Sequence, residues 1–322
     1  MKVCVTVDLD NYRQYSSLVD PGHDDGADHE TSFYTDALPR FLDLFDSHGI
    51  RATFFVVGED AARPAHRAVL RDALARGHEL GNHSYSHPYN FRQLSREQKV
   101  EEIERGEAEI ADAVGERPRG FRTPSFDVDE ETVQLLDERG YVYDSSTFPT
   151  PMMWAFMLYG KLFVKHGDYQ LGRLSAVMAP KLPYVPSRAH MHRRGRNGDA
   201  AGLSIVEIPV SVLPVLTLPF YSTLLRRMGK RAFSLMMRLY GSNRPLLHSM
   251  FHLIELAELD GTALGQAYEQ MPGLSVSLPV RTRFLAHAMG SMAALGTPVT
   301  MGELAHDYRR DRGGRPENPL PS

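Results

Sequence analysis

The chain has 322 residues, of which 42% are apolar, and its formal net charge is −4. This length supplies enough apolar side chains for a large core in one domain or two. The small negative charge excludes a global basic field, so no nucleic-acid partner is expected. Cys4 is the only cysteine, which rules out an intramolecular disulfide, and its apolar surroundings predict a small core residue.

No segment predicts export or membrane insertion. The first residues read MKVCVTVDLDNY, and Asp8 and Asp10 interrupt the apolar run long before it reaches the length of a signal peptide. An uninterrupted apolar stretch of about 18 residues, as a transmembrane helix needs, does not occur. We therefore expect a cytoplasmic protein.

Taken in chain order, the predicted elements alternate between strands and helices. Apolar and β-branched runs predict strands at 2–8, 52–58, 141–146, 205–212 and 246–256, and a further strand that starts at residue 78. Helices are predicted at 36–48, 61–76, 95–114, 130–139 and 279–295. Gly49 and Gly77 end the first two helices, and Ser95 with Gln98 forms a capping box on the third. This alternation predicts a parallel sheet or barrel with helices outside it.

Two stretches and the tail depart from the alternation. Residues 149–203 form an irregular insertion rich in Met, Pro and aromatic residues, and residues 213–245 form an accessory segment of apolar and basic residues. The charged, Pro-rich stretch 308–322 predicts a disordered tail. We expect residues 1–307 to form a single domain.

The first motif with chemical potential is TVDLD. Asp8 and Asp10 are two residues apart at the end of a strand, so both side chains project to one side. Two carboxylates there are costly to bury unless they are paired or bind a metal. The motif alone is equally compatible with a solvated loop start.

The second motif is GHELGNHSYSH. His83 and His87 are four residues apart, a spacing that can hold one metal ion, and Pro88 favours a turn over a helix. With one aspartate these histidines would complete three protein ligands and leave positions open for water and substrate. The third motif, GFRTP, places Arg122 at a predicted strand end, where it can pair with a carboxylate or lie as a surface arginine in a turn.

The order TVDLD, HSYSH, GFRTP, YDSS and EIPV resembles the polysaccharide deacetylase (NodB-homology) family. The runs HGIRATFFVVGEDA and ARGHELGNHSYSH are similar to the family's second strand and to the approach to its histidine motif. The resemblance covers residues 1–148 well and residues 205–304 in patches. It implies a distorted (β/α) barrel, here with a large insertion, and hydrolysis of N-acetyl groups on amino sugars.

The resemblance also assigns roles to individual residues. It makes Asp8 the catalytic base, Arg122 the residue that orients this base, and Asp10, His83 and His87 the metal ligands. Asp144 in YDSS resembles, more loosely, the carboxylate that holds the catalytic acid. Zinc is the expected ion, although a His₂Asp set also accepts cobalt, nickel or manganese.

Two features depart from the family pattern. Leu9 separates two aspartates that are adjacent in the common form, which resembles the Asp-x-Asp branch that includes deformylases and cyclic-amide hydrolases. The late histidine motif is ambiguous, because His248 and His252 lie four apart on one predicted strand. We favour His252 as the catalytic acid, because acidic residues follow it and because it lies nearer the carboxyl end of the strand.

The insertion and the accessory segment admit several interpretations. They can form a lid with its own core, a cradle for a lipid tail, or a peripheral membrane contact at the inner face through Arg226, Arg227, Lys230 and Arg231. Arg193, Arg194 and Arg196 are either a solvated loop or a phosphate contact.

The expected function is metal-dependent removal of an N-acetyl group from an amino sugar of a glycan or of a lipid- or nucleotide-linked sugar precursor. One alternative is hydrolysis of another linear or cyclic amide, as in deformylases or imidases. Another is a non-catalytic glycan-binding relic, against which the complete set of Asp8, Asp10, His83 and His87 argues. The sequence does not determine the oligomeric state.

Overall fold

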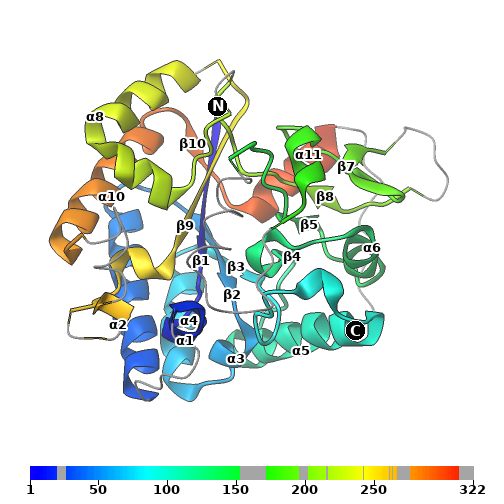
Figure 1. Ribbon diagram of the computed structural model, residues 1–322, viewed down its shortest axis with the longest axis horizontal. Helices are drawn as coiled ribbons and strands as arrows, with labels where there is room; N and C mark the ends of the chain where they lie inside the picture. Colours follow the sequence, from blue (N-terminus) through cyan, green and yellow to red (C-terminus); the bar gives the residue numbers. More distant parts are fainter. Residues whose placement is uncertain are drawn as a thin grey trace.

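The computed structural model describes residues 1–19, 27–152, 172–195, 202–214, 217–241, 243–260, 262, 264–266 and 276–311. Its centre is one parallel sheet that curls into a distorted barrel (Figure 1). The strands of this sheet are β1 (Lys2–Asp8), β2 (Ala52–Val56), β3 (Glu79–Asn82), β4 (Gly120–Phe121), β5 (Tyr143–Asp144), β8 (Val206–Glu207), β9 (Leu246–His252) and β10 (Thr297–Pro298). The predicted fold class is confirmed.

The first strand is the hub of this sheet. β1 pairs along its whole length with β9 on one side. On its other side, Val5–Asp8 pair with β2 and the first residues pair with β10. From β2 the sheet continues in order through β3, β4, β5 and β8. The segment after β8 returns to β9, where the backbone N–H of Ser211 donates to the His248 carbonyl oxygen at 3.1 Å.

Helices cover the outside of the sheet and bury their apolar faces against it (Figure 1). They are α1 (Tyr12–Val19), α2 (Ala27–Asp46), α3 (Gly58–Ala61), α4 (Pro64–Ala75), α5 (Arg96–Val114), α6 (Glu130–Glu138), α8 (Ser222–Tyr240), α10 (Leu278–Ala293) and α11 (Met301–Asp311). Short 3-10 turns lie at Phe91–Gln93, Pro124–Phe126, Leu174–Met178 and Leu253–Leu256. The capping box predicted at Ser95 and Gln98 is present on α5.

Several boundaries differ from those expected. The helix predicted over 61–76 begins only at Pro64, because the chain is extended at Arg63, and Ala61 instead ends the short helix α3. The predicted strand 205–212 pairs in the sheet only at Val206 and Glu207. The strand predicted over 246–256 ends at His252, where a 3-10 turn begins. α11 extends to Asp311, so residues 308–311, expected in a disordered tail, are helical.

The insertion is only partly described. Residues 153–171 and 196–201 lie outside the described part of the chain, and Arg196 with them. The rest contains a hairpin of β6 (Pro186–Ser187) and β7 (His190–Arg194), which holds Arg193 and Arg194. Met191 of this hairpin is buried in a cluster with side chains of β4, α5 and α6, so the described part of the insertion packs on the core of the barrel and forms no separate core. The division of the chain into one domain stays a prediction.

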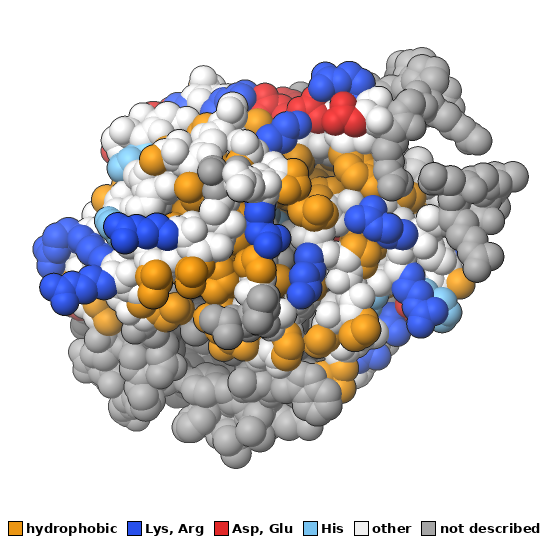
Figure 2. Space-filling model, turned by 90° about the horizontal axis from the view of Figure 1, so that it is seen from above, with side chains coloured by type: hydrophobic (Ala, Val, Ile, Leu, Met, Phe, Trp, Pro, Cys, Tyr) orange, Lys and Arg blue, Asp and Glu red, His pale blue; other side chains and the backbone are white. Residues whose placement is uncertain are grey.

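The accessory segment forms α8, which packs on α10 at one end of the molecule. Figure 2 looks onto this end and shows cations interspersed with apolar side chains, with acids gathered at one margin. Arg226 is not available for a headgroup, because it is mostly buried and paired with Glu255 at 3.1 Å. The side chain of Arg227 lies outside the described part of the structure. Among the described helices, none is long and apolar enough to cross a bilayer.

Candidate active site

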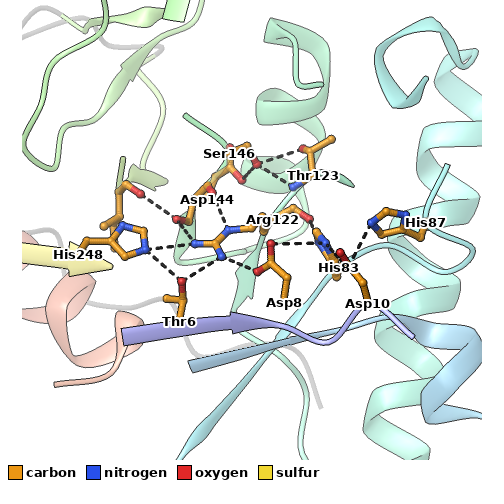
Figure 3. Close-up of polar contacts among 12 residues, drawn as sticks. Thr6, Asp8, Asp10, His83, His87, Arg122, Thr123, Asp144, Ser146 and His248 are labelled. Atoms are coloured by element: carbon orange, nitrogen blue, oxygen red, sulfur yellow. Dashed lines mark hydrogen bonds and ion pairs between the residues drawn. The ribbon is translucent and has the colours of Figure 1, made fainter. Parts of the chain in front are cut away.

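Polar side chains converge where the parallel strands end. Asp8 is the last residue of β1, and His252 is the last residue of β9. His83 follows β3 directly, and Arg122 follows β4 directly. Because the carboxyl ends of parallel strands meet at one rim of a barrel, Asp8, His83 and Arg122 lie together (Figure 3). His252 is the register partner of Asp8 in the pairing of β9 with β1.

Asp10, His83 and His87 bring three potential ligand atoms to one point. Their ligand atoms all lie within 4.8 Å of one another, and all three side chains are buried. Oδ1 of Asp10 is 3.4 Å from Nε2 of His83 and 3.4 Å from Nε2 of His87. The other carboxylate oxygen, Oδ2, accepts a hydrogen bond from the Tyr15 hydroxyl at 3.3 Å. Burial opposes ionisation of Asp10, but the His87 and His83 imidazoles more than offset it and hold the pKa of Asp10 well below its ordinary value.

These three residues fit a divalent metal ion. Oδ1 of Asp10 and Nδ1 of His87 are buried and have no hydrogen-bond partner within the described structure. Atoms that bind one tetrahedral ion at about 2.0–2.2 Å are about 3.3–3.6 Å apart, which the 3.4 Å separations match. Nδ1 of His83 donates to the Arg122 carbonyl oxygen at 2.7 Å, which fixes the tautomer with a free Nε2 lone pair. A carboxylate and two imidazoles suit zinc, cobalt, nickel or manganese.

The turn that carries the two histidines is held in an unusual conformation. Ser84 and His87 have left-handed backbones, with φ of 66° and 58°, which agrees with the predicted turn and excludes a regular helix. Glu102 of α5 secures this turn by accepting hydrogen bonds from the backbone N–H groups of Tyr85 and Ser86. Gly106, also on α5, lets this helix approach closely, since a Cβ there would lie 2.9 Å from the Ser84 carbonyl carbon.

Asp8 lies beside the candidate metal triad of Asp10, His83 and His87 and is paired with a buried arginine. Oδ1 of Asp8 accepts from Nη1 of Arg122 at 2.5 Å, and Oδ2 is 3.9 Å from Nε2 of His83. The Arg122 guanidinium also donates to Thr6 and to Ser145, and it lies 4.1 Å over the Phe55 ring. These contacts satisfy a buried cation and fix the orientation of the Asp8 carboxylate.

The two late histidines lie in different environments. His248 is fully buried, with Nε2 3.3 Å from Arg122 Nη2 and 3.2 Å from Thr6 Oγ1, and with Nδ1 2.9 Å from the Pro209 carbonyl oxygen. Burial and the Arg122 charge lower the pKa of His248 to about 3, so this imidazole stays neutral. His252 is half-buried at the rim, and its ring makes an edge-to-face contact with Tyr221 at 5.4 Å.

Asp144 does not have the surroundings that the sequence led us to expect. We expected it to orient His252, but its described contacts are with Ser146, at 2.5 Å, and with the carboxyl group of Glu207 on the neighbouring strand. Burial raises the pKa of Asp144 to about 6, and burial together with Asp144 raises that of Glu207 well above its ordinary value. A proton held between the two carboxyl groups would account for both shifts. Ser146 links Asp144 to the site, because its hydroxyl donates to Asp144 and accepts from the backbone N–H of Thr123 at 2.8 Å.

Sequence reasoning missed several residues that support the site. Tyr15 lies outside every motif, and Thr6, the first residue of TVDLD, carries no local sign of its contact with Arg122. The fold brings these two residues to Asp10 and Arg122. Ser145 lies within the YDSS motif, but its role as a partner of Arg122 has no local signature. Glu207, in the EIPV motif, is a carboxyl group within a strand, where burial requires a partner, and this signal could have identified it.

Comparison with known proteins points to one family. Residues 22–143 match the family model described as polysaccharide deacetylase, a range that includes His83, His87 and Arg122 but neither Asp8 nor His252. A peptidoglycan-N-acetylglucosamine deacetylase from Bacillus cereus is 29% identical over 119 residues, which cover 37% of this chain and 40% of that protein. A peptidoglycan deacetylase-like protein from Gibberella zeae is 26% identical over 151 residues, which cover 45% of this chain and 44% of that protein. The chain thus spans less than half the length of these curated relatives.

Solved structures share the fold over nearly the whole chain. A candidate polysaccharide deacetylase from Mycobacterium smegmatis aligns with a TM-score of 0.59 and 20% identity, over 100% of this chain and 94% of that one. The PuuE allantoinase aligns with a TM-score of 0.59 and 16% identity, over 96% of this chain and 90% of that one. These structural alignments show a common fold, including the parts of the barrel outside residues 22–143.

Proposed function

We propose that this chain, which carries a polysaccharide deacetylase domain, is a metal-dependent hydrolase that removes an N-acetyl group from an amino sugar of a glycan or of a lipid- or nucleotide-linked precursor. The observation that carries this proposal is the convergence of Asp10, His83 and His87 beside the Asp8–Arg122 pair. A relic that only binds glycans has no need of three buried ligands and a charged pair in one place.

Asp10, His83 and His87 would hold the ion. When bound, a divalent metal supplies Lewis acidity that polarises the acyl carbonyl and lowers the pKa of water. Neighbouring groups hold two of these side chains in fixed orientations. The Tyr15 hydroxyl fixes the Asp10 carboxylate, and the Arg122 carbonyl oxygen fixes the His83 imidazole. The left-handed backbone at Ser84 and His87 sets the direction of the second imidazole.

Asp8 is assigned as the base that accepts a proton from the attacking water. Arg122 holds one oxygen of Asp8, which leaves Oδ2 directed toward His83 and the triad. The guanidinium therefore orients the carboxylate through a charge-assisted hydrogen bond. Because Arg122 is itself fixed by Thr6 and Ser145, the carboxylate is held before substrate binds.

His252 is assigned as the acid that protonates the departing amine. In the pairing of β1 with β9, Asp8 and His252 are register partners, so their side chains emerge on the same face of the sheet. His248 is a poor candidate, because it is enclosed by Arg122, Thr6 and Pro209 and remains neutral. The half-buried ring of His252 can meet both solvent and substrate.

A panel of N-acylated substrates tests this proposal. Metal-loaded protein is incubated with N-acetylated oligosaccharides, N-formylated sugars and cyclic amides, and mass spectrometry identifies the released acid. Acetate from the oligosaccharides is the expected result. If only formate or ring-opened products appear, the protein is instead a deformylase or a cyclic-amide hydrolase. No product from any substrate, at full metal occupancy, would favour the glycan-binding relic. The cytoplasmic location stays a prediction.

A further inference from the structure

The second half of α8 has an outer face composed of cations and leucines. Every exposed residue of this half is one or the other: Lys230, Arg231, Leu235, Arg238 and Leu239. Leu235 is 55% exposed and Leu239 is 58% exposed, one helical turn apart. The opposite face buries Phe233, Met236 and Met237 in the core, so the helix does not need these leucines for packing. A helix face in contact with water only would ordinarily carry polar and acidic residues.

The neighbouring helix α10 extends this face. Ser234 of α8 and Nε2 of His287 on α10 are 2.9 Å apart, and the rings of Phe233 and Phe284 pack beneath them. Arg283 and Val280 are exposed and precede His287 by four and seven residues, so they lie on the same side of α10. An open depression of about 400 Å³ lies between the helices, lined by Lys230, Arg231, Ser234, Leu235, Arg238 and His287.

The charge on this face is of one sign. The sequence contains no aspartate or glutamate from Ile208 to Ile254, nor from Gln270 to Gly302, although the whole chain has a net charge of −4. Within the described part of the chain, Lys230, Arg231, Arg238 and Arg283 have no ion-pair partner. Figure 2 shows the result: cations and apolar side chains alternate over α8, at the left of the view. The face, which we call the α8–α10 face, is complementary to a surface that is anionic and also accepts apolar side chains.

We propose that the α8–α10 face binds the surface of an anionic phospholipid bilayer. The cations would contact lipid phosphates, and Leu235 and Leu239 would enter the boundary between headgroups and acyl chains. A nucleic acid would satisfy the cations but leave both leucines in water. A two-fold contact with a second copy would place the same cations opposite one another. The inference does not depend on the proposed hydrolysis, because it concerns residues outside the active site.

Vesicle flotation tests this inference. Full-length protein is mixed with vesicles of phosphatidylcholine alone, or of phosphatidylcholine with phosphatidylglycerol, and the fraction that floats is measured at low and high salt. We expect binding only to the anionic vesicles, and weaker binding at high salt. Each basic residue near an anionic surface contributes about fivefold in partitioning, so K230E/R231E should lower binding by roughly 25-fold or more. L235S/L239S should lower it without any change in charge.

A matched control comes from another exposed pair. Met178 is 84% exposed and Lys181 is exposed nearby, so M178S/K181E removes one apolar and one basic group outside the α8–α10 face. This control should float like the wild type, and all variants should keep the wild-type melting temperature and the same turnover of a soluble substrate. Equal binding to both vesicle types, no binding at all, or unchanged binding of both α8 variants would overturn the inference. A wild-type dimer that L235S/L239S converts to a monomer would instead identify the face as a subunit interface.

Discussion

Asp8 and His252 are direct register partners at the last positions of β1 and β9. Their side chains therefore emerge side by side on the face of the sheet that also carries Thr6 and His248. A general base and a general acid need to address opposite ends of the same scissile bond. The pairing of β1 with β9 alone fixes the spacing of these two groups, although 243 residues lie between Asp8 and His252 in the sequence.

The first prediction concerns metal affinity. His83→Ala removes one of the three converging ligand atoms, so metal content after dialysis against zinc should fall by at least about tenfold. Elemental analysis and titration calorimetry measure this directly, without any assay of activity. His306→Ala is the control, because His306 is exposed on α11. Wild-type metal content in His83→Ala would exclude the triad as the site.

The second prediction separates metal binding from proton transfer. Asp8→Asn keeps the size of the side chain but removes its ability to accept a proton, so kcat should fall by about 10²–10⁴. Metal content should stay at the wild-type level, because Asp8 lies beside the triad and is not part of it. Turnover near the wild-type level, measured at full metal occupancy, would mean that another group is the base.

The third prediction distinguishes the two late histidines. His252→Ala should lower kcat by about 10²–10⁴ with little effect on stability, because its ring is half-buried and contacts only Tyr221 among the described interactions. His248→Ala should instead lower the free energy of unfolding by about 1–3 kcal/mol, because it deprives buried Arg122 and Thr6 of a partner. Urea unfolding and turnover at equal metal occupancy measure both effects. The reverse pattern would assign the acid to His248.

The fourth prediction concerns the pH dependence of stability. The pKa of Asp144 in the folded protein is about 6, above its ordinary value of 3.8, and that of Glu207 is also raised. Arg122 and Tyr184 are the other charged or titratable groups that face this pair. A carboxyl group whose pKa is raised by folding stabilises the protein at low pH, and this contribution is lost as pH rises through the folded-state value. The loss should therefore begin near pH 4, pass through about pH 6 with Asp144, and continue at higher pH with Glu207.

Glu207→Gln tests this dependence, because its amide can donate to Asp144 without a titratable proton. Relative to the wild type, the variant should gain stability steadily from pH 5 to pH 8, as measured by urea unfolding. The variant must be compared with the wild type at each pH, because other groups titrate in the same range. Burial lowers the pKa of His66 and His78 to about 4, so their contribution to the free energy of unfolding rises with pH over part of this range. This contribution is the same in both proteins and cancels in the difference. A stability difference that does not change with pH would rule out the shared proton.

The fifth prediction concerns the contact between α5 and the histidine turn. A Cβ at Gly106 would lie 2.6 Å from Oδ1 of Asn82 and 2.9 Å from the carbonyl carbon of Ser84, so Gly106→Ala should displace the turn. We expect a loss of about 1–3 kcal/mol in stability together with weaker zinc binding, although no ligand is altered. Gly115→Ala is the control. It places a methyl group in open space at φ of 79°, so it should cost stability and leave zinc affinity unchanged.

The sequence was a good guide to groups that lie within one motif or at a strand end. HSYSH predicted the turn, and its spacing predicted two imidazoles near one point, because Pro88 and the spacing are local features. It could not predict that His248 packs on Arg122 or that Asp144 pairs with Glu207, because these contacts depend on which strands become neighbours. The length of β8 was overestimated because an apolar alternating run does not reveal where its pairing partner ends.

The position of β9 has a consequence for the order of assembly during synthesis. Asp10, His83 and His87 all lie in the first 87 residues, whereas His252 reaches Asp8 only when β9 pairs with β1. Contacts between such distant segments form late, since long loops must close first. A nascent chain should therefore gather its metal ligands well before it acquires its acid. Until β9 arrives, the unpaired edge of β1 leaves Thr6 and Asp8 open to water. On the roles proposed above, the metal site should therefore form before the protein can hydrolyse an amide.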